Sequence, residues 1–206
     1  WNYEKRLQYP INIKTPNAKI AQFIMTSYGG PDGEINASLA IFSEIFYAQP
    51  YGSSVLNDVG TEELAHLEMI STMVHQLTRD LSMEEIEKSG LGPYYIDHTV
   101  GVWPQAAGGV PLNACEFQSK GDPVTDLFEN LAAEQKARST YDNILRVVRN
   151  IPEIADPIRF LRAREVVHFQ RFGEALRSVQ EQLDSKNFYA FNPSFDMPCE
   201  ASCKKC

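Results

Sequence analysis

The feature that most constrains the fold of this chain is a pair of Glu-x-x-His units, each on the apolar stripe of a segment with helical periodicity. One unit is Glu63 with His66, and the other is Glu165 with His168. At a spacing of three residues the two side chains leave one face of a helix, so carboxylate and imidazole converge. Glutamate is rarely buried unless it is paired or bound to a cation. The two units therefore indicate helices that meet around a polar centre.

Apolar residues at alternating steps of three and four mark the core-facing stripes of the long helices. These helices are expected at residues 17–48 with a break at "GGPDG" (29–33), at about 57–81, at about 123–149 and at about 152–183. The stretch "SMEEIEKSG" predicts a short capped helix. Residues 91–121 are rich in Gly and Pro and predict a long irregular crossover.

Strand signals are nearly absent, so the expected fold class is all-α. Four long helices with a long connection between the second and third predict a ferritin-like four-helix bundle of the crossover type. The length of 206 residues suits a single domain with a sizeable core. We expect an N-terminal arm at 1–16, the bundle with its metal site at 17–185, and an extended C-terminal arm at 186–206.

Two more glutamates belong to the same pattern. Glu34 falls in the first turn after "GGPDG", and Glu134 lies on the stripe of the third long helix. A single Glu or His on an apolar stripe is more often a rim or hydrogen-bonded core residue than a ligand. Two glutamates together with two Glu-x-x-His units, however, form the constellation of dinuclear carboxylate bundles. Two divalent cations would balance the four carboxylates, whereas His75 and His98 lack suitable partners and are expected outside the centre.

The charge and hydropathy of the chain exclude some classes of partner. The net charge of −8 is spread along the sequence, whereas nucleic acids and anionic membrane surfaces require clustered Lys and Arg. No stretch approaches the ~20 apolar residues of a transmembrane helix. The start, "WNYEKRLQYP", lacks the apolar core of a signal peptide. We therefore expect synthesis in the cytoplasm without a signal peptide.

The cysteines do not form a disulfide framework for the core. Cys115 lies in mid-chain, and Cys199, Cys203 and Cys206 lie in the last eight residues. The tail "CEASCKKC" offers three thiols, whereas structural zinc takes four ligands. Crosslinks between chains or reduced thiols are therefore favoured over a metal knuckle.

Four segments carry a resemblance to a known family: "AQFIMTSYGGPDGEINASLAIF", "GTEELAHLEMI", "LAAEQKARSTYDNI" and "REVVHFQRF". Together they resemble the non-haem manganese catalases, most closely the spore-coat branch from endospore-forming bacteria. The resemblance covers about residues 15–185, and its GG-x-x-GE turn is more specific than Glu-x-x-His alone. It implies disproportionation of hydrogen peroxide, a homo-oligomer that is a hexamer, a place in the spore coat, and spore-coat proteins as partners.

The resemblance also implies roles for individual residues. It places Glu34 and His66 on one manganese ion, Glu134 and His168 on the other, and Glu63 as the bridge between the two ions of each chain. Glu165 then corresponds to an outer-sphere carboxylate that moves protons during O–O cleavage, although the bundle pattern alone would make it a ligand. The catalytic roles therefore fall to Glu165 and Glu63.

This chain departs from the family pattern at two positions. Family members commonly have a Tyr seven residues after the first ligand, where this chain has Ile41. Some have an Arg directly before the third ligand, where this chain has Ala133. Arg138, one turn after Glu134, is a candidate for the missing positive charge. These departures bear on rate and pH dependence more than on the reaction.

Three alternatives use the same pattern. A di-iron ferritin or oxygenase has the same oxygen and nitrogen ligands, so ligand type does not distinguish manganese from iron. A rubrerythrin-like peroxidase needs an electron-entry module, usually four thiols in two Cys-x-x-Cys pairs, which the tail does not supply. A structural spore-coat protein with a vestigial site would not require every ligand position to be intact. The favoured hypothesis is a manganese catalase.

Overall fold

The computed structural model describes residues 4–45, 53–96 and 102–182. Its elements are α1 (Ala18–Gly29), α2 (Glu34–Glu44), α3 (Ser53–Thr78), α4 (Met83–Ser89), α5 (Gly92–Ile96), a 3₁₀ turn (Ala114–Glu116), α6 (Pro123–Val148) and α7 (Pro152–Gln182). Within these ranges the chain forms no strand, and its β structure is an isolated bridge between Gln105 and Pro111. The predicted all-α class is confirmed.

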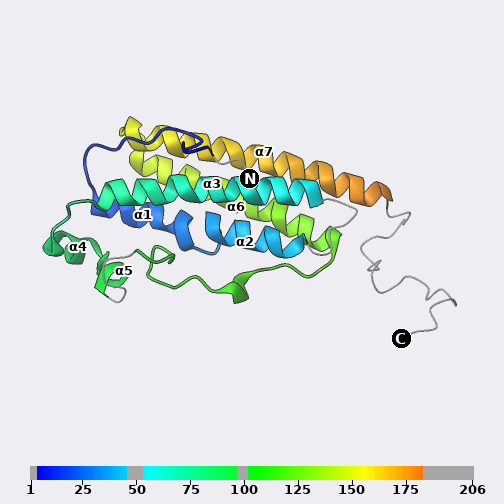
Figure 1. The fold of residues 1–206 in the computed structure, drawn as a ribbon, viewed down its shortest axis with the longest axis horizontal. Helices are drawn as coiled ribbons and strands as arrows, with labels where there is room; N and C mark the ends of the chain where they lie inside the picture. The colour runs from blue at the N-terminus through cyan, green and yellow to red at the C-terminus, as the bar shows by residue number, and fades with distance from the viewer. Residues whose placement is uncertain (1–3, 46–52, 97–101, 183–206) are drawn as a thin grey trace.

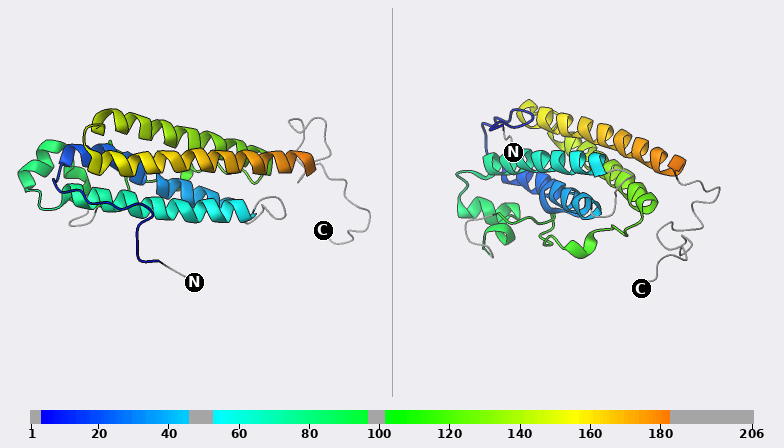
Figure 2. Two further views of the ribbon diagram at one scale, coloured as in Figure 1. Left: turned by 90° about the horizontal axis from the view of Figure 1, so that it is seen from above. Right: turned by 45° about the vertical axis from the view of Figure 1, so that its right-hand side comes forward.

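The long helices run side by side as two antiparallel pairs (Figure 1). α1 and α2 follow one another along the bundle, and α3 returns beside them. α6 and α7 form the second pair, and α3 also packs against α7 (Figure 2). Residues 102–122 run back along the bundle to the start of α6. This is the ferritin-like arrangement with a long crossover between the second and third long helices.

The break between α1 and α2 depends on close backbone contacts. A Cβ atom at Gly29 would lie 2.2 Å from the backbone nitrogen of Gln105, so only glycine lets the crossover pass at this point. The aspartate of the GGPDG turn does not cap the next helix, because α2 begins after Gly33 without a side-chain cap. Asp32 instead pairs with Lys136 at 3.0 Å, which ties the turn to α6.

The other helix ends agree with the sequence signals. In α4, Ser82 and Glu85 form a capping box, and Gly90 ends the helix with φ of 82°. Asp122 caps α6 through the backbone N–H of Thr125. α3 begins at residue 53 rather than about 57 and ends at residue 78 rather than about 81.

The apolar core consists of two clusters on either side of a polar centre. One cluster lies on α1, the second half of α3, and the adjoining ends of α6 and α7, and includes Met69 and Leu161. The other lies towards the opposite end of the bundle and includes Val59 and Phe172. Along both α3 and α7 the Glu-x-x-His unit falls between the two clusters. Apolar packing therefore closes the polar centre at both ends.

The described part of the N-terminal arm packs onto the bundle. Ile13 is fully buried, and its backbone N–H donates to Gln76 Oε1 on α3 at 2.6 Å. The ring centroids of Tyr9 and Phe160 on α7 lie 5.3 Å apart. The arm therefore covers part of the seam between α3 and α7.

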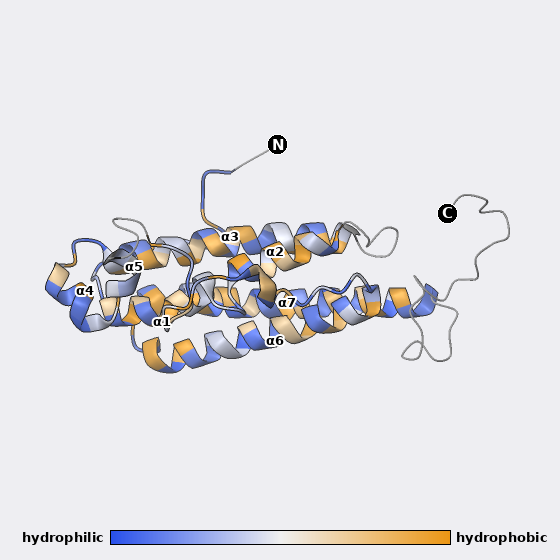
Figure 3. Ribbon diagram, turned by 90° about the horizontal axis from the view of Figure 1, so that it is seen from below, coloured by the Kyte–Doolittle hydropathy of each residue, from blue (hydrophilic) through white to orange (hydrophobic). Residues whose placement is uncertain are grey.

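Hydropathy varies along every long helix, with hydrophilic and hydrophobic residues alternating (Figure 3). No helix among the described residues is long and apolar enough to cross a membrane. Cys115 is an exposed free thiol. His98 and the predicted C-terminal arm with Cys199, Cys203 and Cys206 lie outside the described residues.

Candidate metal centre

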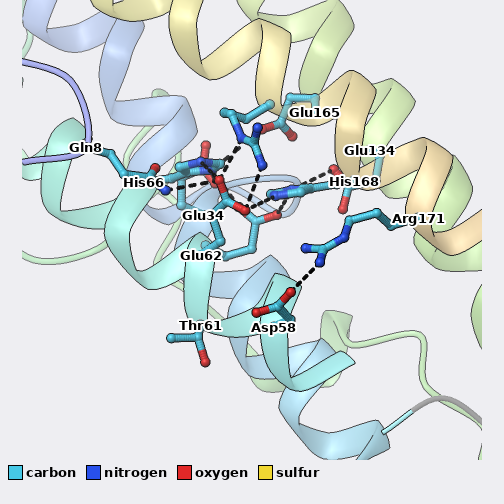
Figure 4. Close-up of polar contacts among 12 residues, drawn as sticks. Gln8, Glu34, Asp58, Thr61, Glu62, His66, Glu134, Glu165, His168 and Arg171 are labelled. Carbon is cyan, nitrogen blue, oxygen red and sulfur yellow. Dashed lines mark hydrogen bonds and ion pairs between the residues drawn. The ribbon is translucent and has the colours of Figure 1, made fainter. Parts of the chain in front are cut away.

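The structure brings all six predicted site residues together inside the bundle. Figure 4 labels all of them except Glu63. Each is 4% exposed or less, and they come from four helices: Glu34 from α2, Glu63 and His66 from α3, Glu134 from α6, and Glu165 and His168 from α7. The two Glu-x-x-His units contain four residues, and each residue offers one candidate ligand atom. These four atoms all lie within 4.8 Å of one another. Helix packing has thus built one compact donor cluster from distant parts of the chain.

Glu63 lies between the two imidazoles. Its Oε2 is 2.9 Å from Nδ1 of His66, and its Oε1 is 2.8 Å from Nδ1 of His168. The two rings are stacked, with centroids 5.3 Å apart and an angle of 20° between their planes. One carboxylate therefore faces both imidazoles through different oxygens.

Each imidazole has a second carboxylate on its own side of the cluster. Glu34 Oε2 lies 3.6 Å from Nδ1 of His66, and Glu134 Oε2 lies 3.6 Å from Nδ1 of His168. Glu165 Oε1 lies 3.7 Å from Nδ1 of His66 in the first half, and the Glu165 side chain also interacts with Glu134 in the second. The cluster thus has two similar halves that share Glu63, and Glu165 contacts both.

Several buried polar atoms of the cluster have no hydrogen-bond partner. They are Glu63 Oε1, His66 Nε2, Glu165 Oε1 and both ring nitrogens of His168. Buried polar atoms left without partners are costly, and buried carboxylates need a compensating charge. Carboxylate oxygens with imidazole nitrogens form a donor set that suits divalent manganese or iron. The residues therefore fit a metal centre.

Without a cation, three of the four carboxylates of the cluster have raised pKa values. Glu63 is the exception, because burial acts to raise its pKa but the two histidines lower it well below its usual range. Burial, and after it the negative charge of Glu63, raise the pKa of Glu34 to about 8 and that of Glu134 to about 7. Burial and the neighbouring carboxylates also raise the pKa of Glu165 well above its usual range. Burial acts to lower the pKa of His168, but the carboxylates around it raise that pKa to about 11. Metal uptake is therefore expected to release protons.

Two residues next to the ligand set were not singled out in the sequence. The hydroxyl of Tyr141, a side chain that is 1% exposed, donates a hydrogen bond to Glu34 Oε1. Glu62 faces the imidazoles from the side opposite Glu63. The stripe of α6 did include Tyr141, two turns after Glu134, but periodicity cannot say which core hydroxyl reaches a ligand. The hydroxyl of Tyr141 thus reaches the cluster, although this chain has Ile41 at the position where family members commonly have a Tyr.

A cavity of about 420 Å³ lies between α2 and α6 and reaches the cluster. Glu34, Glu134 and Glu165 line its inner part, and the partly exposed Asp32 and Lys136 line its outer part. A small molecule can therefore approach the cluster along this cavity.

Both departures from the family pattern, Ile41 and Ala133, lie on the cavity wall. The suggestion that Arg138 supplies the missing charge is wrong. Its guanidinium binds Asp142 at 2.7 Å and Gln135 at 2.8 Å, and it does not line the cavity. The Arg138 side chain is 29% exposed, whereas Glu134 and Tyr141 on the same stripe are buried.

Glu44 is a buried carboxylate on the same cavity wall, ten residues after Glu34 and hence about 15 Å along the helix. Ser119 Oγ and Asn130 Nδ2 donate to it at 2.9 and 2.6 Å. Burial raises its pKa to about 7 although both hydrogen bonds lower it. The retained proton therefore stabilises the fold at low pH, and this contribution is lost as the pH rises from 4.5 to about 7.

We therefore expect Glu44→Gln to stabilise the metal-free chain at about pH 8 by up to about 3 kcal/mol, and to have little effect at about pH 4. Urea unfolding at both pH values measures the difference. Glu84→Gln, an exposed carboxylate on α4, is the control and should change neither value. An equal effect of Glu44→Gln at both pH values would contradict the raised pKa.

Comparisons with known proteins agree with this centre. A model of the family described as manganese-containing catalase matches residues 1–198. The chain is 43% identical to protein CotJC of Bacillus subtilis over 189 residues, which is 92% of this chain and 100% of CotJC. It is 29% identical over 200 residues to a probable manganese catalase of Clostridium acetobutylicum, covering 91% of this chain and 84% of that protein.

A solved structure is also similar. The crystal structure of wild-type KatB, a manganese catalase from Anabaena, superposes with a TM-score of 0.79 at 29% sequence identity. The match covers 89% of this chain and 83% of KatB. Fold, buried donor cluster and sequence thus agree, and the chain belongs to the manganese-containing catalase family.

Proposed function

We propose that this chain is a manganese catalase that disproportionates hydrogen peroxide to water and dioxygen at two manganese ions. Glu34 and His66 bind one ion, Glu134 and His168 bind the other, and Glu63 bridges them. The proposal rests mainly on Glu63, whose two oxygens lie 2.9 and 2.8 Å from Nδ1 of the two histidines. A carboxylate in that position would offer one oxygen to each ion of a two-metal site.

A bound manganese pair supplies the two-electron chemistry that reduces one peroxide to water and oxidises another to dioxygen. The chain contributes the handling of protons and water. Glu165 has a buried carboxyl with a raised pKa, at the inner end of the cavity. It can hold a proton at Oε1 when peroxide arrives and donate this proton to the peroxide oxygen that leaves as water. The peroxide that is oxidised to dioxygen can supply the next proton. The apolar clusters on both sides of the centre exclude bulk water there, so water reaches the centre through the cavity.

A peroxidase is the alternative that the same donor set would support. It must take up two electrons from a donor in each turnover, whereas a catalase is reduced again by its own substrate. We therefore expect one dioxygen for every two peroxides consumed in buffer without a reductant. An oxygen electrode and a peroxide assay on the same sample measure this ratio. Peroxide loss without matching dioxygen, or a strict need for an added donor, would reject the catalase proposal.

The choice of manganese over iron follows the family and not the ligand types. Elemental analysis of the purified chain, and peroxide assays after reconstitution with each metal, test that choice. Activity with iron alone would favour a di-iron enzyme.

The hexamer, the place in the spore coat and the partnership with other coat proteins also stay predictions. The 43% identity to CotJC supports the relationship from which they follow. A structural role in the coat predicts a chain that assembles normally when the centre is disabled, which His66→Ala would test. Crosslinking through Cys199, Cys203 and Cys206 is part of the same prediction.

A further inference from the structure

Glu62 lies where it can contact both histidines of the centre. It directly precedes the bridging Glu63, but its carboxylate faces the opposite side of the rings (Figure 4). Its Oε2 is 3.1 Å from Nε2 of His168, and its Oε1 is 3.7 Å from Nε2 of His66. The two imidazoles are therefore enclosed by consecutive glutamates, with Nδ1 towards Glu63 and Nε2 towards Glu62.

Other side chains hold the Glu62 carboxylate in place. Arg164 donates to both of its oxygens, with Nε 2.6 Å from Oε1 and Nη2 3.0 Å from Oε2. Gln8 of the N-terminal arm donates to Oε1 at 3.0 Å. A planar guanidinium that binds both oxygens fixes the plane of a carboxylate as well as its position. Glu62 is thus a rigid acceptor, with its side chain 13% exposed.

Both Nε2 atoms face a Glu62 oxygen, although neither forms a hydrogen bond in the structure. We propose that Glu62 is a positioning residue that accepts the Nε2–H of both His66 and His168 once metal ions are bound, and so presents both Nδ1 lone pairs to the metal centre. A neutral imidazole has one N–H and one lone pair, and the partner of the N–H decides which nitrogen is free to bind a metal. Usually each ligating histidine has its own partner. Here one carboxylate serves both rings and links the two halves of the centre. This inference rests on the proposed ligand assignment.

The substitution Glu62→Gln distinguishes this role from a general contribution to packing. A glutamine has nearly the same size, but it offers one acceptor oxygen and one donor nitrogen. It can accept from one Nε2–H and not from the other. We therefore expect at least one histidine to lose its orienting partner, and manganese affinity to fall roughly 10–100-fold. Chelator competition on the full chain measures that affinity.

A second readout does not depend on manganese or on activity. In the chain loaded with diamagnetic zinc, which takes the same oxygen and nitrogen ligands, NMR detects the ring N–H protons directly. We expect both Nε2–H signals of the wild type to be shifted downfield and slow to exchange. In Glu62→Gln at least one should move upfield and exchange faster. Arg164→Lys keeps the charge but loses the two-point contact, and should shift both signals in the same direction by less.

A matched control lies on the same two helices. Asp58 on α3 and Arg171 on α7 form a second ion pair, and neither contacts a histidine ring in the structure (Figure 4). Asp58→Asn should leave the ring N–H signals and the manganese affinity at wild-type values. The inference is overturned if Glu62→Gln behaves like Asp58→Asn in both measurements. Absence of dioxygen release by the wild type would refute the catalase proposal instead, and would leave the NMR result intact.

Discussion

Replacing either His66 or His168 by alanine is expected to abolish peroxide decomposition and to lower the manganese content. Each proposed ion has one nitrogen ligand, and both rings are fully buried, so no water-exposed substitute lies nearby. The loss of affinity should exceed the roughly 10–100-fold cost of removing an outer-shell partner. Elemental analysis measures the metal, and electron paramagnetic resonance should show an isolated ion in place of a coupled pair.

His75→Ala is the matched control for these variants. His75 lies on α3 nine residues after His66, is exposed, and does not belong to the donor cluster. That variant should keep wild-type metal content and activity. Retention of the full wild-type manganese content in His66→Ala or His168→Ala would show that the ligand assignment is wrong.

Glu165→Gln is expected to keep both metal ions and to lower the turnover rate by roughly 10²–10⁴-fold, the usual contribution of a general acid or base. The Glu165 carboxyl is 1% exposed, and its Oε1 has no hydrogen-bond partner in the structure. A carboxamide has a similar shape but cannot hold and release the proton. Steady-state kinetics and elemental analysis on the same preparation separate the two effects.

The same variant decides between the two interpretations of Glu165. The structure places its oxygen within the group of candidate ligand atoms, as the bundle pattern predicts, whereas the family resemblance makes it an outer-sphere residue. Loss of one ion in Glu165→Gln would show that it is a ligand. Glu44→Gln removes another buried carboxylate from the same cavity, about 15 Å along α2 from Glu34, and should leave metal content and turnover unchanged.

Much of the fold could be predicted because its signals are local. The apolar stripes of α3 and α7 are buried at the expected positions, from Val59 to Leu77 and from Ile154 to Val179. Helix ends with strong chemical signals, such as the capping box of α4, were also predicted. On α6 the steps of three and four predict Leu145 at the core after Tyr141, but Ile144 is buried and Leu145 is only partly buried. Because α6 has few apolar residues, its orientation depends on its contacts with α7.

The donor cluster could be predicted from the sequence for a related reason. Burying a carboxylate on an apolar stripe is too costly without a partner, and a spacing of three residues fixes carboxylate and imidazole on one helical face. Glu34, Glu63, Glu134 and the two histidines meet in the structure as that argument requires. Their individual roles as ligands or proton carriers stay predictions, to be decided by the variants above.

The sequence by itself determined the helices, their inward faces and the residue types that meet at the centre, because each depends on neighbours within about one or two turns. Only the tertiary structure decided what surrounds those residues. Glu62 lies off the apolar stripe that singles out Glu63, yet Arg164 and Gln8, which reach it from α7 and the N-terminal arm, place it against the far side of both imidazoles. Such contacts depend on how helices from distant parts of the chain approach one another, which no periodicity along a single helix records.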